Sequence, residues 1–303
     1  MKIAEVFGAL CVFGGLAMST VPTHADNMPE GGWPELVGQG VVSTPAREFA
    51  AALPPEGQSI YFNRSGENGE WHIWASSVVD DSFTPAEPLW FSDARYADLD
   101  PFVSRSGDRL YFSSDRPLPG SNSDERTVDT NTWYAPRTEN GWGEPVFAGD
   151  AVNSSASETF VSESAAGELL FARFGEGEGR ARPSYLMLAK RTENGFSEPV
   201  QIETQPTVLR LTNPAISPDG RLIVAAGTNG DRPKLYFSKK TDTGDWSEFR
   251  ALPEPVNIEG AVQFAPYISN DGKWLYFSSS GEKRKGAGSD DIYRIPLPGL
   301  IGW

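Results

Sequence analysis

The segment Ser104-Arg105-Ser106-Gly107-Asp108-Arg109-Leu110-Tyr111-Phe112 joins a polar turn to a short run of large apolar residues. Because glycine supplies the positive φ that a tight turn needs, the segment predicts a hairpin whose second strand carries the apolar run. The apolar signature occurs five times: Ile60-Tyr61-Phe62, Leu110-Tyr111-Phe112, Leu169-Leu170-Phe171, Leu222-Ile223-Val224 and Leu275-Tyr276-Phe277. Successive copies end 50, 59, 53 and 53 residues apart, slightly more than the roughly 40 to 50 residues of a usual propeller blade.

Two further strand-like segments follow most copies of the signature. The first is rich in aromatic and aliphatic residues and is found at 71–74, 132–134, 185–188, 235–237 and 292–295. The second is found at 83–85, 142–146, 196–200 and 246–250, and proline occurs in the first three of these. Proline is tolerated in an outermost strand because one edge of that strand is unpaired. Four strands in each repeat predict the blade of a β-propeller.

The last repeat lacks a fourth strand of its own. Residues 32–37 resemble residues 141–146, which form a predicted fourth strand, and they lie just before the first repeat. We therefore expect residues 33–37 to complete the last blade and to protect its edge. The sequence predicts an all-β, five-bladed β-propeller with four-stranded antiparallel blades, located at about 45–92, 97–150, 156–203, 210–258 and 262–295 plus 33–37.

The N-terminal residues predict export. Lys2 precedes an apolar run from Val6 to Met18, and Thr23-His24-Ala25 fits a small-x-small cleavage pattern. We expect residues 1–25 to be a signal peptide cleaved near Ala25, and residues 26–303 to be a single propeller domain in the periplasm or outside the cell. No membrane span is expected, because no later stretch approaches the roughly 20 apolar residues that a spanning helix needs.

The formal net charge of −15 disfavours nucleic acid and anionic lipid as partners, because such a surface repels phosphate groups. The single cysteine, Cys11, lies in the predicted leader. The mature protein is therefore expected to have no disulfide, no thiolate metal site and no cysteine nucleophile.

The repeats resemble the TolB-like (WD-like) β-propeller repeats of bacterial envelope proteins. The resemblance rests on Asp100-Pro101-Phe102-Val103-Ser104 leading into the segment 110–116, and on Asn213-Pro214-Ala215-Ile216-Ser217-Pro218-Asp219-Gly220. It implies a platform that binds an envelope protein or peptide. Propellers carry many unrelated activities, so the resemblance predicts the fold more firmly than the function.

Polar residues open the predicted inner strand of each blade, which lines the central tunnel of a propeller. They are Glu48, Asp98, Asp100, Glu158, Asn213 and Gln263. One interpretation is that they satisfy backbone groups and solvate the tunnel; the other is that they bind a ligand at an acidic tunnel mouth. No cofactor is expected other than a weakly bound calcium ion, for which Asp98, Asp100 and Glu158 are the candidate ligands because calcium prefers hard oxygen atoms.

Catalysis is the alternative function. The predicted mature chain has one histidine, His72, and it lacks a Gly-x-Ser-x-Gly elbow, a phosphate loop and a His-Glu-x-x-His motif. Carboxylates remain, and a glycoside hydrolase uses a pair of them on either side of the scissile bond. Asp100 and Glu158 are the candidate pair. We expect a non-catalytic binding or scaffolding protein, with a glycan-acting hydrolase as the alternative.

Overall fold

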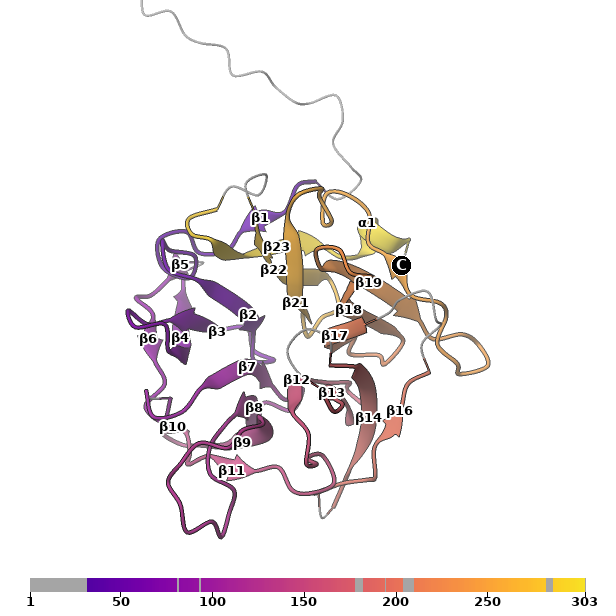
Figure 1. Ribbon diagram of the computed structural model, residues 1–303. Helices are drawn as coiled ribbons and strands as arrows, with labels where there is room; N and C mark the ends of the chain where they lie inside the picture. Colours follow the sequence, from indigo (N-terminus) through magenta and orange to yellow (C-terminus); the bar gives the residue numbers. More distant parts are fainter. Residues whose placement is uncertain are drawn as a thin grey trace, which may run out of the picture.

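The computed structural model describes residues 32–302 except 81, 93, 178–181, 194, 204–209 and 282–285. Five small antiparallel sheets surround a common centre, and strands β2, β7, β12, β17 and β21 are the innermost (Figure 1). This is the five-bladed β-propeller predicted from the repeats. The predicted signal peptide, including the cleavage position near Ala25, lies outside the described residues.

Each blade is built from consecutive strands of the chain. Blade 1 contains β2 (Glu48–Ala52), β3 (Ser59–Ser65), β4 (Trp71–Val79), β5 (Ser82–Phe83) and β6 (Glu87–Pro88). Blade 2 contains β7 (Asp98–Val103), β8 (Arg109–Ser114), β9 (Asn131–Thr138), β10 (Gly141–Trp142) and β11 (Val146–Phe147). Blade 3 contains β12 (Glu158–Glu163), β13 (Glu168–Phe174), β14 (Ser184–Thr192), β15 (Gly195–Phe196) and β16 (Val200–Gln201). Blade 4 contains β17 (Arg210–Ile216), β18 (Leu222–Thr228), β19 (Lys234–Lys239) and β20 (Arg250–Ala251). Blade 5 contains β21 (Val262–Ile268), β22 (Trp274–Ser280), β23 (Asp290–Pro296) and β1 (Glu35–Leu36).

Strand β1 closes the ring. It pairs antiparallel with β23, with Glu35 opposite Arg294 and Leu36 opposite Tyr293 (Figure 1). The Val37 N–H extends the pairing by donating to the Ile292 carbonyl at 2.9 Å. The prediction that an N-terminal strand completes the last blade is confirmed, and the strand itself is two residues long. It covers the edge of β23, which would otherwise be open to pairing with another chain.

The outer strands of blades 1 to 3 differ from the expected single strand. Each is divided into two short pieces that pair with the same third strand, as β5 and β6 both pair with β4. Between these two pieces, the Thr84 hydroxyl accepts the Ser77 N–H at 3.1 Å and Pro85 has no N–H to donate. The Thr84 N–H still donates to the Ser77 carbonyl at 2.9 Å, so the side-chain bond replaces one of the two backbone bonds expected at this point.

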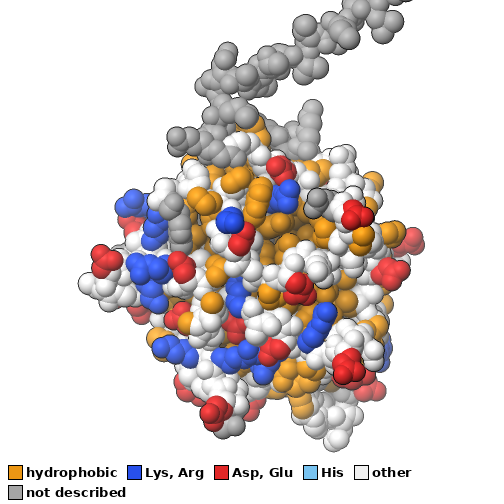
Figure 2. All heavy atoms as spheres, turned by 180° about the vertical axis from the view of Figure 1, so that it is seen from behind, with side chains coloured by type: hydrophobic (Ala, Val, Ile, Leu, Met, Phe, Trp, Pro, Cys, Tyr) orange, Lys and Arg blue, Asp and Glu red, His pale blue; other side chains and the backbone are white. Residues whose placement is uncertain are grey.

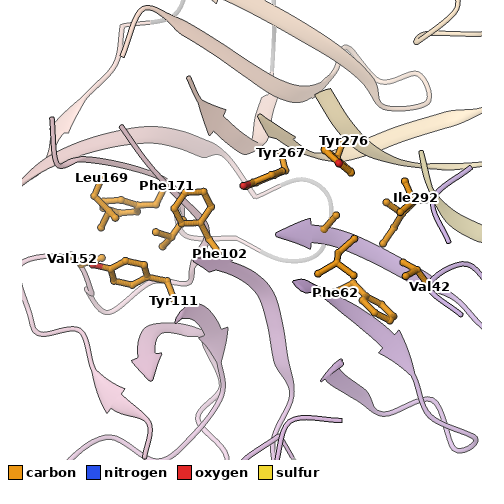
Figure 3. Packing of buried hydrophobic residues seen from close by; sticks show 14 of the residues in the cluster. Val42, Phe62, Phe102, Tyr111, Val152, Leu169, Phe171, Tyr267, Tyr276 and Ile292 are labelled. Carbon is orange, nitrogen blue, oxygen red and sulfur yellow. The ribbon is translucent and has the colours of Figure 1, made fainter. Parts of the chain in front are cut away.

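The core consists of layers between neighbouring blades. Because successive side chains of a strand point to opposite faces, Tyr111 packs in one layer with Leu169 and Phe171 of blade 3, whereas Leu110 and Phe112 pack in another layer that includes Ile73 of blade 1. Figure 3 shows the first of these layers, with Tyr111 and Phe102 facing Leu169 and Phe171. A signature residue is therefore buried on whichever face of the strand it lies. This explains why three consecutive residues are apolar, whereas apolar and polar residues would alternate in a half-exposed strand.

Helix is restricted, among the described residues, to the single turn α1 (Pro298–Ile301). None of the helical structure in that part of the chain is long and apolar enough to cross a membrane.

Candidate functional site

The two faces of the propeller differ in which ends of the strands they contain. The inner strands begin at Glu48, Asp98, Glu158, Arg210 and Val262, and we call this side the entry face. The hairpin turns that lead into the second strands lie on the opposite side, which we call the turn face.

Three of the predicted site residues are buried acids on the entry face, each paired with an arginine. Glu48, Asp98 and Glu158 are all fully buried. Their carboxylates lie 2.8 Å from Arg64, 2.7 Å from Arg116 and 2.8 Å from Arg173, respectively. Burial raises the pKa of each carboxyl group, and hydrogen bonds and the arginine charge partly oppose that rise.

The same arginines also bind the loops that precede the inner strands. Arg116 donates to the Phe91 carbonyl at 2.6 Å, and Arg173 donates to the Val152 carbonyl at 2.9 Å. Arg64 donates to the Val41 carbonyl in the same way. Each pair therefore joins an inter-blade loop to its blade, which is a structural role.

Blades 4 and 5 lack this pair. The residues that align with Glu48 are Leu211 in blade 4 and Gln263 in blade 5, and the cross-strand partners of these residues are Gly227 and Ser279. The sequence alignment placed Asn213 in this row. The structure aligns Asn213 with Asp100 instead, because both are the positive-φ residue of the bulge in their inner strand, two positions after the row of Glu48.

The bulges form a second row around the tunnel. The residue at each bulge has a left-handed backbone: Ala50 (φ 57°), Asp100 (φ 58°), Phe160 (φ 55°), Asn213 (φ 49°) and Ala265 (φ 45°). This conformation is uncommon outside glycine. Four of these five residues line a tunnel cavity of about 20 Å³, as does Pro214 beside Asn213. The cavity has room for about one water molecule.

Asp100 is the carboxyl group that lines the tunnel cavity, and only 4% of its surface is exposed. Its N–H donates to Asn63 Oδ1 of blade 1 at 2.7 Å. Burial raises the pKa of its carboxyl group to about 7, against the opposing effects of the Ser113 hydroxyl and the Phe160 N–H. Asp100 therefore connects blades 1, 2 and 3 and exchanges a proton near neutral pH.

Arg105 of blade 2 lies at the turn-face end of the tunnel, and the sequence analysis did not identify it. Its guanidinium donates to the carbonyls of Glu163 at 2.7 Å, Ile216 at 3.0 Å and Ile268 at 3.2 Å. These acceptors belong to blades 3, 4 and 5. Asn270, which accepts a fourth bond from Arg105 at 2.8 Å, donates to the Leu53 carbonyl of blade 1. The guanidinium therefore lies at the centre of the turn face, where it bonds to three other blades directly and to the fourth through Asn270.

A pocket of about 600 Å³ opens on the entry face over blades 4 and 5, and we call it the mouth pocket. It occupies the sector in which the arginine–carboxylate pair is missing. Its lining includes Arg47, Arg210, Asn213, Asp231, Phe264 and Asp290. Of the six predicted site residues, Asn213 lines the mouth pocket and Asp100 lines the tunnel cavity, whereas Glu48, Asp98, Glu158 and Gln263 line neither.

The mouth pocket combines charge with aromatic surface. Arg47, whose side chain is 58% exposed, donates to Asp290 at 2.6 Å and lies 5.2 Å from the ring centre of Trp71. Phe49 links Trp71 to Phe264, with ring centres 4.9 and 5.8 Å away. An exposed guanidinium therefore stands beside an aromatic wall. Such a combination suits a ligand with both apolar and polar groups.

No group of three or more His, Cys, Asp or Glu side chains within the described ranges is arranged to hold a metal ion. Asp98, Asp100 and Glu158 are all described, so they do not form such a group. Weak calcium binding stays a prediction.

The surface charge is mixed in sign. Figure 2 shows Lys and Arg side chains interspersed with Asp and Glu side chains, and hydrophobic side chains are visible between them. The net charge of −15 is therefore not concentrated in a single acidic patch on the face shown in that figure.

Comparisons with known proteins agree on the fold. No protein-family model and no curated protein matches the chain. An α-L-arabinofuranosidase from Lactobacillus brevis is 13% identical with a TM-score of 0.54, over 83% of this chain and 90% of that one. A GH43 endo-arabinanase from Bacillus licheniformis is 11% identical with a TM-score of 0.52, over 86% and 96%. TolB from Acinetobacter baumannii is 12% identical with a TM-score of 0.48, over 83% of this chain and 55% of that one. At these identities the likeness shows the propeller fold alone.

Proposed function

We propose that the protein is a non-catalytic binding propeller of the bacterial cell envelope, and that a protein or peptide ligand occupies the mouth pocket. The observation that carries the proposal is the position of this pocket. It lies on the entry face, where the repeat of arginine–carboxylate pairs is interrupted, and Arg105 fills the opposite end of the tunnel. Loops on a rigid scaffold commonly carry binding sites.

The state of the candidate catalytic pair supports binding over hydrolysis. Glu158 is fully buried and is bonded to Arg173 and Ser154, while Asp100 is 4% exposed. A glycoside hydrolase needs both carboxyl groups beside the bound sugar. One observation favours the alternative: the pKa of about 7 at Asp100 is suitable for a general acid. Catalysis by Asp100 is therefore included in the test.

The test is site-specific photo-crosslinking in an envelope extract. A photoreactive amino acid replaces Thr228, which lines the mouth pocket, or Thr241, an exposed residue near the turn face. We expect a discrete protein adduct from position 228 and none from position 241. Equal labelling from both positions would argue against the mouth pocket. Turnover of a glycan panel that is lost in Asp100→Asn would favour the hydrolase instead.

A further inference from the structure

A second pocket lies at the outer edge of blade 1, away from the tunnel. It has a volume of about 440 Å³ and forms where the outer strand is divided between β5 and β6. Polar groups of Ser77, Thr84 and Glu87 line it, together with Ala75 and the indole ring of Trp90. Within the described part of the chain, no Lys or Arg lines it. We call it the edge pocket.

Trp90 presents a fixed aromatic surface at the edge pocket. It is 59% exposed, which is unusual for a tryptophan held in place on both sides. Its Nε1–H donates to the Trp142 carbonyl of blade 2 at 2.9 Å, and its ring packs edge-on against Phe91 with centres 5.6 Å apart. Because the N–H is already used, the ring offers its π face to a ligand rather than a hydrogen-bond donor.

Blade 5 contains a complete version of the chemistry that blade 1 leaves open. The two blades can be aligned on their signature residues, Phe62 and Phe277. In this alignment Ala75 corresponds to Arg294, and its cross-strand partner Glu87 corresponds to Glu35. Arg294 lies 2.8 Å from Glu35, and its guanidinium lies 4.6 Å from the ring centre of Trp274. The cation there is held between a carboxylate and an aromatic ring.

In blade 1 the arginine of this arrangement is replaced by alanine. Glu87 stays exposed beside Ala75, and within the described part of the chain no basic side chain pairs with it. An aromatic ring, Trp90, is nevertheless present in the same pocket. The pocket therefore has the carboxylate and the ring but not the cation.

We propose that the edge pocket binds a lysine or arginine side chain from a basic segment of a partner protein. The cation is attracted by the Glu87 carboxylate and by the π face of Trp90. The net charge of −15 adds a longer-range attraction for a basic partner. This site is separate from the mouth pocket, so it does not depend on the function proposed above.

The test titrates the full-length mature protein with tetra-arginine peptide at low ionic strength, and uses tetra-glutamate as the control probe. Binding is followed by the indole N–H resonances in NMR spectra, and Trp90→Ala assigns the resonance of Trp90. We expect tetra-arginine to shift this resonance, and Glu87→Gln to weaken binding at least threefold. We expect Ala75→Arg, which places a cation opposite Glu87 as Arg294 lies opposite Glu35, to weaken binding at least fivefold.

Ser121→Arg is the matched control, because it adds the same charge at an exposed position of blade 2. It should change the affinity less than twofold. The proposal is overturned if Ala75→Arg and Ser121→Arg weaken binding equally, because attraction would then be non-specific. It is also overturned if saturating tetra-arginine leaves the Trp90 resonance in place. Should Ala75→Arg fail to fold, Glu87→Gln against Glu144→Gln, an exposed glutamate of blade 2, gives the same comparison.

Discussion

Asp100 stands at a position where the other blades have Ala50, Phe160, Asn213 and Ala265. None of these four carries a charge. A carboxyl group is therefore not needed to form the bulge. The effect of the Asp100 carboxyl group on the stability of the fold depends on whether the group is protonated. Because the pKa of Asp100 is raised from 3.8 to about 7, the folded protein binds the proton more tightly than the unfolded chain.

This gives a pH dependence with a defined sign. The contribution of Asp100 to stability is fully present below about pH 4 and is lost as the pH rises through about 7, since the buried group must then ionise. The rise of the Asp100 pKa from 3.8 to about 7 corresponds to roughly 4 kcal/mol. Asp100→Asn should remove this dependence, and asparagine already adopts the same backbone at position 213.

Denaturant unfolding at pH 4, 6 and 8 measures the effect. The difference in unfolding free energy between Asp100→Asn and wild type should increase with pH in favour of the variant. Other buried carboxyl groups titrate equally in both proteins, so the difference isolates Asp100. Parallel pH profiles for the two proteins would contradict the assignment.

At the scale of the element, a strand of only two residues closes the ring. Strand β1 contributes two residues to the ladder, and its Glu35 side chain pairs with Arg294. Val37, which follows it, is 5% exposed and belongs to the core that also contains Ile292. The N-terminal segment therefore supplies both an edge cover and a core residue.

Deleting residues 26–37 should expose the edge of β23 and remove the buried Val37 side chain. We expect a lower melting temperature and concentration-dependent oligomers, because an open strand edge pairs readily with another chain. Light scattering after size-exclusion chromatography, together with a thermal melt, measures both effects. A monomeric variant with an unchanged melting temperature would show that β1 does not hold the ring closed.

The division of the outer strands is also an effect at this scale. Each divided strand leaves a local opening in the ladder, and in blade 1 this opening becomes the edge pocket. A side-chain hydrogen bond from Ser77 N–H to Thr84 satisfies the backbone group that the ladder leaves free.

Across the whole molecule, the two ends of the tunnel are built differently. The entry face has arginine–carboxylate pairs in blades 1 to 3 and the mouth pocket over blades 4 and 5. At the turn face, the guanidinium of Arg105 in blade 2 donates to carbonyl groups of blades 3, 4 and 5. Under the proposed function, this asymmetry places the ligand on the entry face.

Arg105→Met should destabilise the protein by about 3 kcal/mol or more, because several buried carbonyl groups lose their donor. Arg126→Met is the control, since Arg126 also donates to two backbone carbonyls but its side chain is 47% exposed. The control substitution should lower the free energy of unfolding by less than about 1 kcal/mol. Chemical denaturation compares the two variants, and equal losses would refute a special role for Arg105.

The sequence by itself determined the number of blades, the four-strand repeat and the closure by an N-terminal strand. These features follow from local turns and from apolar residues that must be buried in every copy, so each repeat carries the information independently. The signature Leu110-Tyr111-Phe112 is an example, because its alternating faces fill two different layers between blades.

Only the tertiary structure decided which polar residues face a pocket. Asn213 was grouped with Glu48 by sequence, but in space it occupies the bulge position, as Asp100 does, whereas Glu48 lies two residues before the bulge residue Ala50. The arginine partners of Glu48, Asp98 and Glu158 lie 15 to 18 residues away along the chain.

Arg105 binds acceptors 58 to 165 residues away, and no local pattern in the sequence predicts these contacts. One signal was present: Arg105 is the charged residue at a turn position where the other blades have Pro55, Ala165, Pro218 and Asn270. Whether a polar side chain is free to bind a ligand depends on what the folded chain places beside it, and that is a property of the assembled ring.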